Sequence, residues 1–241
     1  MPVRSLAAAL VALSLVTAAA AAPGGAQTKL GPCVTTTDSR TICGSGPGAL
    51  MVLDGTTSPS GKFAIAWRSR SGSIEEPADI DSVENHLVRL EDGKNLSLVV
   101  GRLWKTGNAQ GNHINQTVAW SPDSRWLLVG DSGKWALEAI AIYAIDEGAG
   151  AAKGLGLFRA ISGAAARMLR ERVGASKAGS YTLDISGDQN IEVANTGAVS
   201  IPMLFQIPKE DKDITLLVQF KASRNGNRVA TSPIEVSVVK R

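Results

Sequence analysis

Short runs of apolar residues, separated by turn residues, recur along the chain and predict a mostly β protein. The runs at 63–67 (FAIAW) and 126–130 (WLLVG) are apolar on both alternating faces, which favours strands covered on both sides. Turn signals such as Glu91-Asp92-Gly93-Lys94 and Asn225-Gly226 predict hairpins between neighbouring runs. The other predicted strands are 86–90, 96–101, 137–145, 202–207, 214–220 and 234–239.

One segment repeats along the chain. Residues 58–67 (SPSGKFAIAW) match residues 121–130 (SPDSRWLLVG) at an offset of 63, each with a Ser-Pro turn, a basic residue and an apolar run. Proline sets φ at the second position of such a turn, and the small residues after it complete the reversal. A weaker third copy is expected at 185–193, with Ile191 in the position of Trp126. This recurrence indicates repeated β modules.

The two clear copies resemble the blade signature of TolB-type, WD-repeat-like β-propellers, in which this turn opens an inner blade strand. The resemblance implies a β-propeller-like repeat architecture with few blades or an incomplete ring. The offset of 63 is longer than the roughly 40–50 residues of an ordinary blade. Another all-β arrangement, such as a sandwich, is the alternative. The expected fold class is therefore all-β with one helix.

The helix is predicted over residues 162–174 (SGAAARMLRERVG), with Ser162 as its N-cap and Gly174 just past its end. Its apolar stripe comprises Ala165, Met168, Leu169 and Val173, and its polar side carries Arg167, Arg170 and Arg172. Such a stripe predicts a surface helix packed on an edge or an end of the β assembly.

The first 26 residues have the three-part layout of a secretory signal peptide. A basic start ends at Arg4, an apolar stretch follows from Leu6, and small residues allow cleavage near Ala21 or Ala26. The stretch is short for a membrane span, and no other segment is long and apolar enough. We expect a periplasmic or secreted protein. The expected organisation is a signal peptide (1–26), a disulfide-bearing segment (27–48), two repeats (49–150), a linker with the helix (151–180), and a third repeat with a closing hairpin (181–241).

Export changes the interpretation of the two cysteines. Cys33 and Cys43 are ten positions apart, and an oxidising compartment favours their pairing. A disulfide across so short a loop contributes roughly 2–3 kcal/mol in the chain-entropy model. A catalytic thiol is the alternative, but no histidine lies near either cysteine in sequence.

Composition excludes several classes of protein. The formal charge is only +3, which argues against nucleic-acid binding. The chain has two Cys and two His, so a four-Cys zinc site is impossible and a site of two Cys and two His would need all four residues. Residues 79–86 (DIDSVENH) offer oxygen and imidazole ligands but lack the full calcium-loop pattern, so neither a metal site nor a cofactor is expected.

The five tryptophans all lie between residues 67 and 135, and two of them adjoin polar turns. An exposed indole beside amide side chains can stack on a sugar or line a peptide groove. The candidate ligand-binding residues are therefore Trp104, Asn108, Asn112, His113 and Trp135.

The sequence favours an exported, non-catalytic binding protein that recognises an envelope protein or a surface glycan. It contains no Gly-x-Ser-x-Gly elbow and no His-Glu-x-x-His pair. One alternative is a periplasmic hydrolase that uses His113 or His86 with a nearby carboxylate. Another is a structural subunit of an envelope complex.

Overall fold

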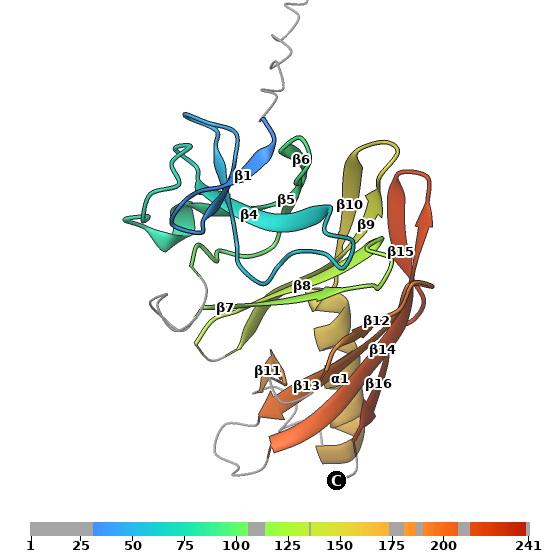
Figure 1. Cartoon of the computed structure of the whole chain (residues 1–241). Helices are drawn as coiled ribbons and strands as arrows, with labels where there is room; N and C mark the ends of the chain where they lie inside the picture. Colours follow the sequence, from blue (N-terminus) through green and yellow to red (C-terminus); the bar gives the residue numbers. More distant parts are fainter. Residues whose placement is uncertain are drawn as a thin grey trace, which may run out of the picture.

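The computed structural model describes residues 31–105, 114–134, 136–173, 181–186, 190–206 and 213–239. Over these residues the chain forms three antiparallel sheets and one α-helix, which confirms an all-β fold with one helix. Figure 1 shows the first sheet above, the second across the middle, and the third below with the helix behind it. A closed propeller ring is not seen in this part of the chain, and the resemblance to propellers stays a prediction.

The first sheet contains the N-terminal segment that the sequence separated from the repeats. Its strands follow one another in chain order, and it curls until the Cys33 amide donates to the Leu90 carbonyl, 3.1 Å away. Cys33 and Cys43 face each other in the β1–β2 register and form the predicted disulfide. The six strands are β1 (Cys33–Thr35), β2 (Thr41–Cys43), β3 (Leu50–Val52), β4 (Phe63–Ser69), β5 (Val83–Arg89) and β6 (Lys94–Val99).

The second sheet is a four-stranded meander in the order β10-β9-β8-β7. The long run predicted at 137–145 is confirmed as its strand β9. Residues 151–156 were expected in a linker, but this was wrong, because they pair with β9 from Gly156↔Ala141 to Ala151↔Asp146. The strands are β7 (Asn115–Trp120), β8 (Trp126–Ser132), β9 (Leu137–Asp146) and β10 (Ala151–Gly156).

The third sheet centres on the long β13–β14 hairpin, as the apolar runs predicted. Strands β11 and β12 both pair with β13, and β15 and β16 both pair with β14. The predicted turn at Asn225-Gly226 joins β14 to β15, with Asn225 opposite Arg228. The strands are β11 (Thr182–Ile185), β12 (Glu192–Val193), β13 (Ala198–Gln206), β14 (Asp213–Asn225), β15 (Arg228–Thr231) and β16 (Glu235–Val238).

The second sheet is the middle layer of the molecule. Leu127 and Val129 of β8 belong to the core shared with the first sheet, whereas Trp126 and Leu128 belong to the core shared with the third sheet and the helix. Successive side chains of a strand point to opposite faces, so both cores need apolar residues from β8. This explains why the run from Trp126 is apolar at every position.

The two Ser-Pro turns lie against each other. The Ser60 amide donates to Ser124 Oγ at 3.0 Å, and Trp120 Nε1 donates to the Thr56 carbonyl at 3.0 Å. In both turns the amide of the fourth residue donates to the carbonyl of the first. The fourth residue has a left-handed conformation, with φ of 69° at Gly61 and 61° at Ser124. The repeat in sequence is thus a repeat in structure.

Residues 187–189 of the predicted third turn lie outside the described residues, and another turn of this kind follows them. Ile191 precedes the two-residue strand β12, so it does not correspond to Trp126. The matching turn runs from Ala194 to Gly197, where the Gly197 amide donates to the Ala194 carbonyl and φ is 80°. It contacts the second turn through Asn195 Oδ1, which accepts from the Asp123 amide at 2.9 Å. The predicted register of the third copy was therefore wrong.

The helix α1 (Phe158–Val173) begins four residues before the predicted N-cap, so Ser162 lies inside it. Its buried stripe comprises Leu157, just before its first turn, and Ile161, Ala165 and Leu169, while Arg167 and Arg170 are exposed as predicted. The side chains of Arg172 and Val173 lie outside the described part. One face of α1 thereby closes the core between the second and third sheets.

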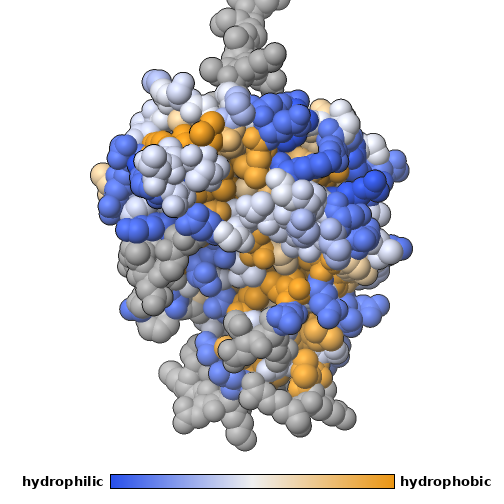
Figure 2. Space-filling view, viewed as in Figure 1, coloured by the Kyte–Doolittle hydropathy of each residue, from blue (hydrophilic) through white to orange (hydrophobic). Residues whose placement is uncertain are grey.

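Within the described ranges, no helix is long and apolar enough to cross a membrane. The predicted signal peptide, residues 1–26, lies outside the described residues. Figure 2 shows hydrophobic residues at the surface both in a patch among hydrophilic residues in the upper part of the view and in the lower part.

Candidate functional site

A groove follows the β2–β3 ribbon on one face of the first sheet. The ribbon register pairs Ile42 with Met51, and a strand repeats its facing every second residue. One face of the ribbon therefore carries Arg40, Ile42 and Gly44 from the β2 side and Ala49, Met51 and Leu53 from the β3 side. These six residues line two hollows that share Ile74 and Glu75 as a common wall. We call the two hollows together the ribbon groove.

The aromatic end of the ribbon groove is a hollow of about 250 Å³. Trp67 from β4 forms its buried base, and the half-buried Trp104 packs edge-on against it, with ring centroids 6.0 Å apart. Lys105 Nζ lies 5.6 Å from the centroid of the Trp104 ring, within the range of a cation–π contact. The aromatic end of the groove therefore has an indole, Trp104, with a lysine ammonium close to its ring.

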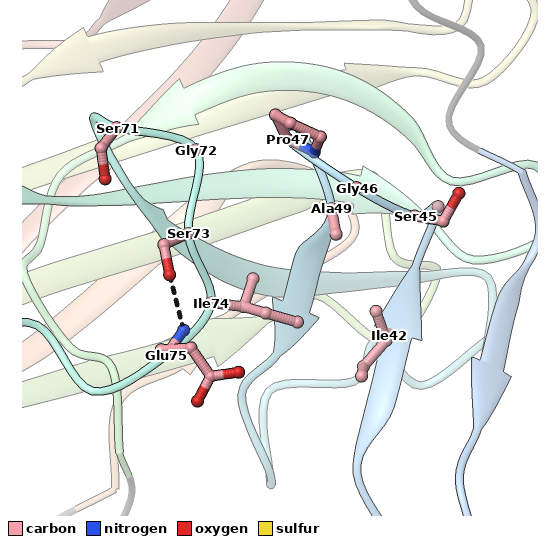
Figure 3. Close-up of a pocket in the computed structure, with 11 residues that line it drawn as sticks. Ile42, Ser45, Gly46, Pro47, Ala49, Ser71, Gly72, Ser73, Ile74 and Glu75 are labelled. Atoms are coloured by element: carbon pink, nitrogen blue, oxygen red, sulfur yellow. Dashed lines mark hydrogen bonds between the residues drawn. The ribbon is translucent and has the colours of Figure 1, made fainter.

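The other end is a wider hollow of about 550 Å³ between the turn at Gly44–Pro47 and the loop at 71–75. Figure 3 shows Ile74 reaching from this loop toward Ile42 and Ala49. The loop is fixed by serine hydroxyls, since Ser69 Oγ accepts from the Ser73 amide at 3.1 Å and Ser73 Oγ accepts from the Glu75 amide at 3.0 Å. Glu75 is therefore held at the junction of the two hollows.

Carboxylates outnumber cationic side chains along the groove, where Asp54, Glu75 and Glu76 stand against Arg40 and Lys105. Asp54, Glu75 and Glu76 are exposed and form no ion pair with any residue that the structure describes. Arg40 is already paired with Asp38, with Nε 2.6 Å from Oδ2. The groove is thus locally acidic on a chain whose formal charge is +3.

Only one of the five predicted ligand-binding residues can be placed. Trp104 lies in the ribbon groove, whereas Asn108, Asn112, His113 and Trp135 lie outside the described residues. The chain just before Asn108 and the chain just before Trp135 are in contact, because Arg102 Nε lies 3.3 Å from Asp131 Oδ2.

Arg102 forms a cluster of ion pairs with residues that line neither hollow of the groove. Its guanidinium contacts Asp131, Asp81 at 3.5 Å, and Glu138. Burial raises the pKa of Asp131, and the positive charge of Arg102 opposes that shift. The oxygen-rich segment at 79–86 therefore has structural partners: Asp81 meets Arg102, and Asp79 caps the short helix Ile80–Ser82. Among the described residues no group of three or more His, Cys, Asp or Glu is arranged to hold a metal ion.

His86 lies on the face of the first sheet opposite the groove. It is 3% exposed, and its Nδ1 accepts from Asn95 Nδ2 at 2.9 Å. Its Nε2 lies 3.6 Å from Glu84 Oε2. Burial, reinforced by the charge of Arg68, lowers the pKa of His86 to about 4. The pair His86–Glu84 lines neither hollow of the ribbon groove.

Sequence reasoning missed most of the groove. Ile74, Glu75 and Glu76 stand in a polar connection whose packing against the ribbon depends on tertiary contacts. No clear local signal marks the ribbon face, because Met51 is flanked by the apolar Leu50 and Val52 and does not alternate with polar residues.

No protein-family model matches the chain, and a search of curated proteins finds no relative.

Proposed function

We propose that this chain is an exported, non-catalytic binding protein that recognises a protein partner or a surface glycan through the ribbon groove. The observation that carries the proposal is the half-buried indole of Trp104, which stands over a groove with polar walls. Aromatic side chains beside a few fixed polar groups are typical of binding sites for peptides and sugars.

Two further features support export. The N-terminal sequence has the layout of a signal peptide, and Cys33 and Cys43 form a disulfide, which persists in oxidising compartments. A periplasmic or secreted location is therefore part of the proposal.

The groove favours binding over hydrolysis. A general base must come within hydrogen-bond reach of its substrate, and His86 is enclosed on the opposite face with a strongly lowered pKa. The described lining of the groove contains carboxylates, hydroxyls and indoles but no imidazole or thiol.

Replacement of Trp104 tests the proposal. We expect Trp104→Ala to weaken partner binding about 30-fold, because a tryptophan that anchors an interface commonly carries about 2 kcal/mol. Partners are identified by cross-linking in the native host, and binding is then measured by pull-down and on a glycan array. Trp104→Phe should retain part of the affinity, since it keeps an aromatic ring.

Leu98→Ala is the matched control, because Leu98 is a large apolar side chain, 58% exposed, on β6 outside the groove. It should bind like the wild type. Unchanged binding by Trp104→Ala would contradict the proposed site. Turnover that is abolished by a His86 or His113 substitution in a folded protein would favour a hydrolase instead.

A further inference from the structure

We propose that the natural occupant of the ribbon groove is an extended, basic segment of a partner protein. This inference rests on the proposed function and names the class of ligand. It is carried by three properties of the groove: its length, its charge and its aromatic end.

The length suits an extended chain. The groove follows the ribbon from Arg40 to Ser45, which at the rise of a β-strand is about 17 Å, or about five extended residues. The shared wall at Ile74 and Glu75 separates two hollows along this line. An extended peptide directs every second side chain to one side, so alternate side chains can enter the two hollows.

The charge favours a cationic ligand over a neutral sugar. Asp54, Glu75 and Glu76 form no ion pair with the described residues, and Arg40 is neutralised by Asp38. Counting Lys105, these groups leave a net charge of −3 + 1 = −2 around the aromatic end. Complementary charge of this kind steers encounter and selects a partner with lysine or arginine.

The aromatic end supplies the second contact for such a side chain. Lys105 Nζ lies 5.6 Å from the centroid of the Trp104 ring, so the position of a cation near this indole is within cation–π range. A lysine or arginine of the partner, laid between Trp104 and Glu76, would gain both an indole face and a carboxylate. A planar guanidinium stacks on aromatic rings better than an ammonium, so arginine should bind more tightly than lysine.

The test is a titration of the mature full-length protein with fluorescein-labelled peptides about seven residues long. One peptide alternates arginine and valine, a second replaces arginine by glutamine, and a third replaces it by glutamate. We expect binding of the arginine peptide and little or no binding of the other two. The variant Glu75→Gln/Glu76→Gln should weaken that binding about tenfold, since it removes two exposed ion pairs.

Glu171→Gln/Glu235→Gln is the control, because it makes the same charge change at exposed residues of α1 and β16. It should bind the arginine peptide like the wild type, and thermal unfolding should confirm that both variants are folded. Equal binding of all three peptides, or equal weakening by both double variants, would overturn the inference. Trp104-dependent binding to a glycan array without binding to the arginine peptide would also overturn it, yet would leave the proposed function standing.

Discussion

The imidazole of His86 is held neutral by its surroundings. Asn95 donates to Nδ1, so Nε2 carries the proton of the neutral ring, and it has no hydrogen-bond partner among the described residues. Burial is the main cause of its lowered pKa, and the nearby charge of Arg68 adds to it, while Glu84 and Asn95 act in the opposite direction. A proton added to this ring would place a positive charge in a buried site.

His86 should make the protein less stable in mild acid. Its pKa is about 4 when folded and 6.5 when unfolded, so between these values the unfolded chain binds more protons. The neutral ring therefore makes its full contribution to the free energy of unfolding above about pH 6.5. This contribution falls by on the order of 3 kcal/mol as the pH is lowered toward 4. Urea unfolding at a series of pH values measures this loss, and His86→Gln should flatten the profile.

His113→Gln is the control, because His113 is the only other histidine of the chain. It should leave the part of the profile due to His86 in place. A His86→Gln protein whose stability falls between pH 6.5 and 4 as steeply as that of the wild type would show that His86 is not the responsible group.

The Ser-Pro turn between β7 and β8 depends on one hydroxyl. Ser121 is fully buried, and its Oγ accepts from the Trp126 amide at 2.9 Å and from the Arg125 amide at 3.1 Å. It also donates to Asp123 Oδ1 at 2.7 Å. In the first turn Ser58 Oγ accepts from the Phe63 amide in the same way, at 3.1 Å. The serine of the motif thus fixes the start of each inner strand.

We expect Ser121→Ala to lower the free energy of unfolding by about 2 kcal/mol, because buried amides lose their acceptor. Chemical denaturation measures the change. Ser223→Ala on β14, where the serine is exposed, should change stability by less than about 0.5 kcal/mol. If the two variants were equally stable, the hydroxyl would not be what fixes the turn.

Several elements could be predicted from the sequence because their signals are local. Two short apolar runs and the Asp92-Gly93 turn between them predicted the β5–β6 hairpin, and Asn225-Gly226 predicted the turn after β14. The third repeat was misplaced because its turn, Ala194–Gly197, keeps the left-handed glycine but lacks the Ser-Pro pair. The start of α1 was misplaced because Ser162 resembles an N-cap, although Ile161 already belongs to the buried stripe.

The candidate site was less predictable than the fold. Trp104 was identified because an indole beside a polar turn is a local signal. Ile74 and Glu75 were not, since their role depends on a loop folding back onto β2 and β3. The pairing of Arg102, which follows β6, with Asp131 of β8 likewise joins segments 29 residues apart in sequence.

At the scale of the whole molecule, the second sheet joins two cores. Leu127 faces the first sheet and Leu128 faces the third sheet and the helix, and both are at most 1% exposed. The contacts between successive turns, Ser60 with Ser124 and Asp123 with Asn195, link the same three sheets along one edge. The stack should therefore unfold as one cooperative unit although its sheets follow one another along the chain.

This cooperativity can be tested from both faces of β8. Leu127→Ala and Leu128→Ala each remove a buried side chain from a different core, and each should cost about 2–5 kcal/mol. If the sheets form one unit, both variants lower the stability of all three together, because losing either core exposes the middle sheet. Hydrogen exchange followed by mass spectrometry should then show faster exchange in both β4 and β13 for each variant. Faster exchange in β4 alone for Leu127→Ala, and in β13 alone for Leu128→Ala, would instead mean that the outer sheets unfold independently.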